Sequence, residues 1–217
     1  MGVAGIRWDS AKHIAVPSEG DNFWAAVLDG SGLWHYAEIL YGIDYADKLI
    51  KEYGDLLSMT DVGFDGKSPE NPYHAYNIPR QRCVFWAESH DTFSNDQTGS
   101  QRISQNDIDR RWALVASRKG ASALYFSRPG LLPKDDIKLA VKGSNHFTAP
   151  EVREVNIFHN IMGNEPEDFY NSGNVAAVYR RKGVVIVTET PGTVEIPCKN
   201  LLTGLTYSDQ ITGNGFQ

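Results

Sequence analysis

The stretch RCVFWAESHDTFSND (residues 82–96) runs from an apolar segment directly into charged side chains. The apolar part lacks the alternation of a half-exposed strand, which predicts a strand buried on both faces of a sheet. The part that follows holds four acidic or histidine side chains: Glu88, His90, Asp91 and Asp96. Such a run either ends in a surface turn or delivers charged groups to a functional site. The pattern of strands and helices in the rest of the chain helps to distinguish these two interpretations.

Strand-like and helix-like segments alternate through most of the chain. Strands are expected at residues 2–9, 33–40, 82–89 and 122–129, and helices at 20–29, 45–57, 104–116 and 148–163. This alternation predicts parallel strands joined by right-handed crossovers. In sheets and barrels of this kind, the ligand site lies at the C-terminal ends of the strands.

Two of the expected helices begin with a capping signature, in which a hydroxyl side chain is followed three residues later by an acid. Ser104 precedes Asp107, and Thr148 precedes Glu151, with Pro150 inside the first turn. The helix at 45–57 is expected to bury one apolar face, made of Ala46, Leu49, Ile50 and Tyr53.

After Gly163 the pattern changes to strands alone. Residues 174–189 read as two strands joined by a tight turn at Lys182-Gly183, and TVEIP (193–197) and the final stretch are also strand-like. The sequence therefore predicts two domains, an α/β domain at residues 1–165 and an antiparallel β-domain at 166–217.

Composition narrows the class of protein. The chain has 217 residues, of which 41% are hydrophobic and 22% charged, as in ordinary globular proteins. A net charge of −6 without a basic stripe argues against binding to nucleic acid, and no apolar run is long enough to cross a membrane. The two cysteines, Cys83 and Cys198, are expected to be buried free thiols.

Three of the expected strands end in an acid: Asp9, Glu38 and Asp91. Two carboxylates that flank a glycosidic bond can cleave it, one attacking the anomeric carbon and the other protonating the leaving oxygen. Arg7 lies two residues before Asp9, on the same side of the strand, and would keep Asp9 ionised. Glu38 lies between two apolar neighbours, and an apolar setting favours the protonated form of an acid catalyst.

A metal site is the rival interpretation of the same side chains. Its ligands would come from His13, His35, His90, Asp9 and Asp91. The chain has no tight motif such as HExxH or CxxC, which makes the metal site the weaker hypothesis. His35 is expected to be a packed strand histidine, Glu88 to cap or pair, and His146 and His159 receive no role.

Five segments follow one another along the chain: GIRWDSAKH (5–13), YAEIL (36–40), WAESHDTFSND (86–96), ALYFSRP (123–129) and EVNIFHNIM (154–162). Taken in this order, they resemble glycoside hydrolase family 13, the α-amylase family of bacterial type. GIRWDSAKH (5–13) is similar to its GFRxDAAKH motif, and YAEIL (36–40) to its YGEIL-like segment. WAESHDTFSND (86–96) is similar to WVESHDTYAND, and ALYFSRP (123–129) to PLFFSRP. EVNIFHNIM (154–162) resembles the last helix of the family's barrel.

The resemblance implies a fold and a set of roles. The fold would be a partial (β/α)8 TIM barrel, about strands 4 to 8, followed by a small antiparallel β-domain. Asp9 would be the catalytic nucleophile, Glu38 the general acid/base and Asp91 the transition-state stabiliser of a retaining hydrolase of α-1,4-glucans such as starch. The substrate-binding residues would be Arg7, Lys12, His13 and His90, and the backbone carbonyl of His13 would be a calcium ligand.

The chain also departs from the family pattern. Ala4, Ile6 and Ala37 replace an acid, a Phe and a Gly of the motifs, which changes the fit of the substrate rather than the chemistry. By comparison with the family, the sequence is not expected to contain barrel strands one to three, the inserted domain that carries most calcium ligands, or a signal peptide. The resemblance implies an extracellular protein. An open barrel predicts a homo-oligomer that completes or covers it, or pairing with the missing half of the barrel.

Two other functions are compatible with the sequence. The chain could be a non-catalytic glucan-binding fragment that keeps the acids but lacks subsites. It could also be a transglycosylase or an α-1,6-acting enzyme of the same family, although the SHDTFSND segment (89–96) favours an α-amylase.

Overall fold

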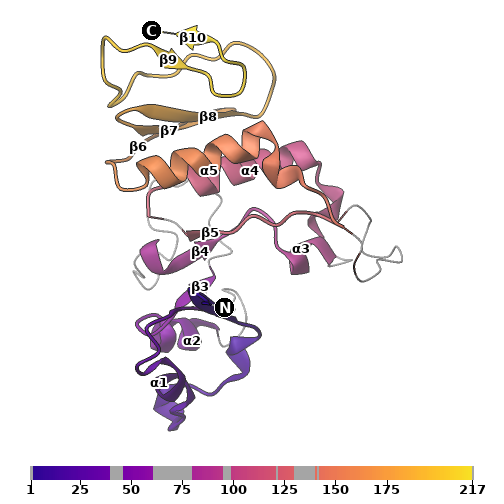
Figure 1. The fold of residues 1–217 in the computed structure, drawn as a ribbon, viewed down its shortest axis with the longest axis vertical. Helices are drawn as coiled ribbons and strands as arrows, with labels where there is room; N and C mark the ends of the chain where they lie inside the picture. The colour runs from indigo at the N-terminus through magenta and orange to yellow at the C-terminus, as the bar shows by residue number, and fades with distance from the viewer. Residues whose placement is uncertain are drawn as a thin grey trace. The chain divides into compact units, whose positions relative to one another are not determined.

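The structure, a computed structural model, describes residues 2–39, 46–60, 80–94, 99–120, 122–129, 140 and 142–216. The chain forms two compact units (Figure 1). The described residues up to Phe85 belong to the first unit, and those from Trp86 onward belong to the second unit. Asp96 lies outside the described residues.

The first unit contains four parallel strands in the order β1-β2-β3-β4. They are β1 (Gly5–Trp8), β2 (Trp34–Ala37), β3 (Ser58–Thr60) and β4 (Cys83–Phe85). Helix α1 (Phe23–Leu28) lies between β1 and β2 along the chain, and helix α2 (Ala46–Tyr53) lies between β2 and β3. The predicted alternation of parallel strands and helices is therefore confirmed in this unit.

Burial of the strands agrees with the sequence pattern. All three residues of β4 are buried, as predicted from its unbroken apolar run. All three residues of β3 are buried as well, but this strand was not predicted, because its sequence SMT is too short to show a period.

Aromatic side chains form the core of the first unit. Trp24 of α1 packs edge-to-face on Trp8 at 5.4 Å and on Tyr53 at 5.6 Å between ring centroids. Leu49, Ile50 and Tyr53 of α2 are buried on one face as predicted. The Tyr53 hydroxyl donates to the carbonyl oxygen of Ile14 at 3.1 Å, which ties α2 to the segment after β1.

The second unit combines helices with an antiparallel sheet. Its helices are α3 (His90–Ser94), α4 (Gln105–Ser117) and α5 (Pro150–Met162), and β5 (Ser122–Ala123) is a short strand. The sheet has the order β6-β7-β8, from β6 (Asp168–Ser172), β7 (Val175–Arg180) and β8 (Gly183–Thr188). Strands β9 (Tyr207–Ser208) and β10 (Gly215–Phe216) pair as a separate antiparallel ribbon. Helices α4 and α5 lie side by side, with the sheet along them (Figure 1).

Short 3-10 helices connect these elements. They are η1 (Ala11–His13), η2 (Pro17–Glu19), η3 (Arg80–Arg82), η4 (Ser100–Arg102) and η5 (His146–Thr148). None of the described helices is long and apolar enough to cross a membrane.

Several sequence predictions of local structure need correction. The strand expected at 122–129 covers only Ser122–Ala123, and TVEIP (193–197) forms no strand. Strand β6 was not predicted, although it lies in the stretch expected to contain strands alone. The turn between β7 and β8 consists of residues 181–182, one position earlier than expected.

Of the two predicted helix caps, one is confirmed. The Ser104 hydroxyl accepts a hydrogen bond from the backbone N–H of Asp107 at 3.1 Å, at the start of α4. Helix α5 instead begins after Ala149 without a side-chain cap, because the Thr148 hydroxyl donates to the carbonyl oxygen of Asn145 within η5. The proline at the first position of α5 lacks the N–H that a cap would satisfy.

A buried ion network joins the helices of the second unit to its sheet. Glu167, just before β6, bonds to Arg118 at the end of α4 at 2.9 Å and to Arg180 of β7 at 3.1 Å. Burial alone would raise the pKa of Glu167, but the hydrogen bond and charge of Arg118 outweigh burial and lower it. This network joins the helices and the sheet within one compact unit. The domain boundary expected near residue 165 stays a prediction.

Both cysteines are free thiols, as predicted. Cys83 is buried within β4, but Cys198 is exposed rather than buried. The expectation for Cys198 was wrong because the segment around it is not a strand and is mostly exposed to solvent.

Candidate functional site

The register of the first two strands brings the acids that follow them together. Trp8 at the end of β1 pairs with Ala37 at the end of β2, and the two strands are parallel. Asp9 and Glu38 are the next residues along each strand, and the Glu38 N–H donates to the Trp8 carbonyl oxygen at 3.0 Å. Two of the three predicted acids therefore lie side by side at the C-terminal edge of this sheet.

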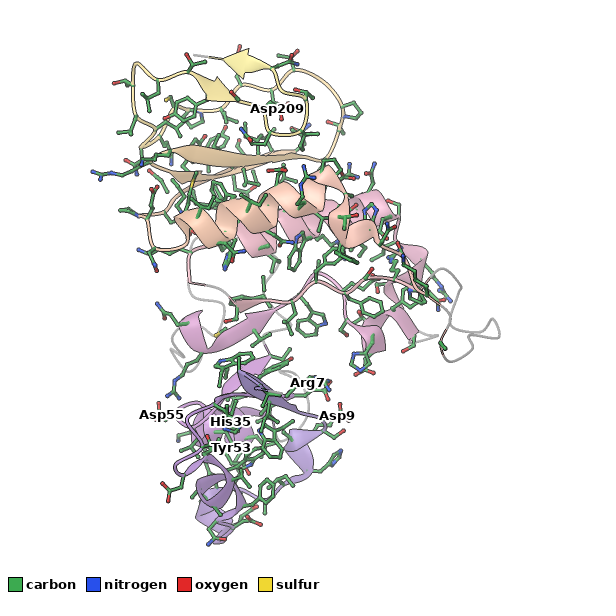
Figure 2. The ribbon with its side chains drawn as sticks, in the orientation of Figure 1. Arg7, Asp9, His35, Tyr53, Asp55 and Asp209 are labelled. Carbon is green, nitrogen blue, oxygen red and sulfur yellow. The ribbon has the colours of Figure 1, made fainter. Side chains whose placement is uncertain are left out.

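Arg7 bonds to both acids. One guanidinium nitrogen donates to Asp9 Oδ1 at 2.6 Å, and the other lies 3.1 Å from Glu38 Oε1. Partial burial lowers the pKa of Arg7, but the hydrogen bond to Asp9 and the charges of Glu38 and Asp9 outweigh burial and raise it. Figure 2 shows Arg7 and Asp9 at the same end of the strand.

The two carboxylates have different surroundings. The Asp9 side chain is 69% exposed, whereas the Glu38 side chain is 13% exposed. The second oxygen of Glu38, Oε2, accepts the backbone N–H of Ser10 at 3.1 Å. The expectation of an apolar setting for Glu38 was therefore wrong, because its carboxylate contacts a cation and an amide even though its neighbours along the chain are apolar.

Ser10 was not predicted to be part of this site. It adopts a left-handed conformation with φ of 49°, which non-glycine residues rarely adopt. Strain of this kind persists where the surrounding structure requires it, often at functional sites. Here the unusual backbone directs the Ser10 N–H to Glu38, and no sequence signal marks it, because serine is not a typical residue for this conformation.

Lys12 and His13 follow in the short helix η1. Ala11 anchors this helix in the core, while Lys12 is half-buried and His13 is exposed. Both residues thus follow Asp9 closely along the chain, and their binding of a sugar unit stays a prediction. A calcium ion at the carbonyl of His13 stays a prediction.

His35 is a packed core histidine, as predicted. It is 7% exposed, and the Trp8 indole N–H donates to its Nδ1 at 3.0 Å. Since an indole N–H can only donate, Nδ1 accepts, and in the neutral ring Nε2 donates to the Ser31 hydroxyl at 2.8 Å. Both ring nitrogens are occupied, which removes His35 from the hypothetical metal ligands.

His90 and Asp91 are the first two residues of α3, in the second unit. Their side chains are 57% and 60% exposed, and His90 Nε2 lies 3.5 Å from Asp91 Oδ1. The expectation for Glu88 is confirmed, because it is 3% exposed and pairs with Arg128 at 2.7 Å and 2.8 Å through both of its oxygens. Glu88 is therefore a structural ion-pair partner.

Comparison with known proteins adds an independent observation. No protein-family model matches the chain. An alpha-amylase from Butyrivibrio fibrisolvens is 30% identical over 268 aligned residues, covering 99% of this chain and 28% of the relative. The chain is similar to alpha-amylases.

Two further relatives carry the same name. An alpha-amylase from Clostridium acetobutylicum is 29% identical over 87% of this chain and 26% of its own length. An alpha-amylase from Aeromonas hydrophila is 22% identical over 83% of this chain and 42% of its own length. The chain thus spans between about a quarter and two-fifths of the length of these relatives.

Proposed function

We propose that this chain is an α-amylase-like retaining glycoside hydrolase that acts on α-1,4-glucans such as starch. The observation that carries the proposal is the pair of strand-end carboxylates, Asp9 and Glu38, bonded to the single guanidinium of Arg7. The similarity to proteins named alpha-amylase supports the substrate class.

The two acids are proposed to have different roles. Asp9 is exposed and bonded to Arg7, which stabilises its charged form, so it is proposed as the nucleophile. Its carboxylate attacks the anomeric carbon, the bond to the leaving oxygen breaks, and that oxygen takes the proton of Glu38. Water then attacks the glycosyl-enzyme ester, giving its proton back to Glu38 and releasing Asp9.

Arg7 and Ser10 have supporting roles in this scheme. As Glu38 loses its proton, Arg7 and the Ser10 N–H already face its oxygens and stabilise the carboxylate. The Arg7 guanidinium and the Ser10 N–H are in place before the reaction, which limits the structural reorganisation that the reaction needs. A separation of roughly 5 Å between the two carboxyl groups is what retaining chemistry requires, and it stays a prediction.

The other predicted site residues remain proposals from sequence. Asp91 is proposed as the transition-state stabiliser and His90 as a sugar ligand. Lys12 and His13 are proposed to bind a neighbouring sugar unit, and calcium at the His13 carbonyl, an extracellular location and assembly with a second copy are likewise untested predictions.

Trapping of the glycosyl-enzyme tests the proposal. A fluorinated glycosyl fluoride forms the covalent ester but slows its hydrolysis, so intact-mass measurement should show one added sugar, and peptide mapping should locate it on Asp9. An Asp9→Asn variant is the control and should gain no mass. Label on another residue, or unlabelled protein that still hydrolyses starch, would contradict the assignment of Asp9.

Binding of glucan without cleavage is the competing function. It predicts that the chain binds maltooligosaccharides in calorimetry yet gains no mass with the glycosyl fluoride. The two measurements together distinguish the hydrolase from a glucan-binding module.

A further inference from the structure

Three potential metal ligands meet in the second unit, and none of them is among the residues proposed for hydrolysis. They are Asp109 of α4, His146 of η5 and Glu151 in the first turn of α5. One ligand atom from each lies within 4.8 Å of the others. Asp109 Oδ2 and His146 Nε2 are 2.7 Å apart.

The Asp109 carboxylate is held in one orientation by groups outside the cluster. Its other oxygen, Oδ1, accepts from the Gln105 amide at 3.0 Å and from the Tyr125 hydroxyl at 3.4 Å. Oδ2 is thereby directed at His146. Metal-binding carboxylates and histidines are typically oriented by such outer hydrogen bonds, which fix the free oxygen toward the ion.

Burial makes the charge of Asp109 unusual. The residue is 7% exposed, and a buried carboxylate is costly unless a cation or hydrogen bonds compensate it. Within the described part of the chain, its ion-pair partner is His146 and not a lysine or arginine. A cation bound at Oδ2 would add direct charge compensation to the hydrogen bonds that Asp109 already makes.

A cavity adjoins the cluster. It has a volume of about 560 Å³ and lies among α4, α5, β8 and the β9 segment. Asp109 and Glu151 line it, as do Glu154 and Asp209, the latter labelled in Figure 2. An ion can therefore enter from the cavity, and water in the cavity can complete its coordination.

We propose that Asp109, His146 and Glu151 bind a divalent cation of the Zn²⁺ class. One imidazole nitrogen and two carboxylate oxygens are ligands that Zn²⁺ accepts, with a fourth position left for water. Calcium prefers six to eight oxygen ligands, which this set does not provide. The site is independent of starch hydrolysis.

Zinc titration of the full chain tests the proposal. After dialysis against a chelator, the protein is titrated with ZnCl₂ in a calorimeter, and one equivalent should bind. The variants His146→Gln and Glu151→Gln should each weaken binding by about 100-fold or more, because each removes a ligand. Calcium chloride at the same concentrations should not compete.

A matched control separates this site from surface carboxylates. Glu195→Gln removes an exposed carboxylate of the second unit and should leave zinc affinity unchanged. Glu151 is partly exposed, so its variant should fold, which circular dichroism checks. Unchanged zinc affinity in both ligand variants, or no saturable zinc binding by the wild-type chain, would overturn the proposal. The three side chains would then form a hydrogen-bonded network without a metal.

Discussion

Each unit of the molecule contains a cluster of arginine and carboxylate side chains, and the two clusters differ in burial. In the first unit, Arg7 is 37% exposed and its partner Asp9 is 69% exposed. In the second unit, Arg118 and Arg180 are 0% and 1% exposed, and Glu167 is 12% exposed. The Arg7–Asp9 pair is thus exposed to water, whereas the pairs of Glu167 with Arg118 and Arg180 lie inside the protein.

This difference in burial predicts that one cluster acts mainly in chemistry and the other mainly in stability. Exposed ion pairs contribute about 1 kcal/mol or less to folding, because water and salt screen them. Removal of one partner from a buried pair leaves an uncompensated charge and costs several times more. We therefore expect changes to the Arg7 cluster to affect activity and changes to the Glu167 cluster to affect stability.

The largest effect is expected for Glu38→Gln. The amide cannot donate the proton that the leaving oxygen needs, so starch hydrolysis should fall by about 10²- to 10⁴-fold. A glycosyl fluoride, whose fluoride leaves without protonation, should still react with the variant. Reducing-sugar and fluoride release measure the two reactions, and an equal loss of both would contradict the role of Glu38 as acid.

Glu167→Gln should produce the next largest effect, on stability. The change removes the carboxylate that the buried Arg118 and Arg180 share, which should lower the free energy of unfolding by about 3 kcal/mol. Urea denaturation measures it. Glu19→Gln, which breaks the exposed pair with Lys48 in the first unit, is the matched control and should leave the unfolding midpoint unchanged.

A smaller effect is expected for Arg7→Lys. Lysine keeps the charge but cannot place two fixed donors on Asp9 and Glu38 at once. Starch hydrolysis should fall by about 10- to 100-fold through misplacement of the acids, with little change in unfolding. A wild-type rate would show that Arg7 does not position them.

The smallest effect concerns acid stability. The pKa of Glu167 is lowered in the folded chain, so its stabilising contribution is present above the ordinary value of 4.5 and is lost as pH falls through the folded pKa. For a single proton this slope cannot exceed about 1.4 kcal/mol per pH unit. Unfolding free energies measured between neutral and acidic pH should depend less on pH in Glu167→Gln than in the wild type, and parallel curves would contradict this.

The sequence predicted the positions of the acids better than their surroundings. Asp9 and Glu38 could be placed because each directly follows an apolar strand, and parallel strands end at one edge. The setting of Glu38 was misjudged because side chains alternate along a strand, so Ala37 and Ile39 point away from the face that Glu38 occupies. Cross-strand neighbours such as Arg7 decide its environment, and they are not adjacent in sequence.

Short or long-range features escaped prediction for similar reasons. Strand β3 has three residues, too few for a period, and TVEIP (193–197) has strand composition without a partner strand. Asp109, His146 and Glu151 come from separate elements, so no local spacing reveals them. That Asp91 acts together with Asp9 and Glu38 likewise stays a prediction from sequence.

The central claim is that Asp9 and Glu38, the carboxylate pair of the first unit, perform hydrolysis. Its most direct test is sugar release from soluble starch by the purified chain and by Asp9→Asn, an isosteric change that removes the nucleophile. We predict release by the wild-type chain and a decrease of about 10³-fold or more in the variant. Equal release from the two proteins would contradict the account.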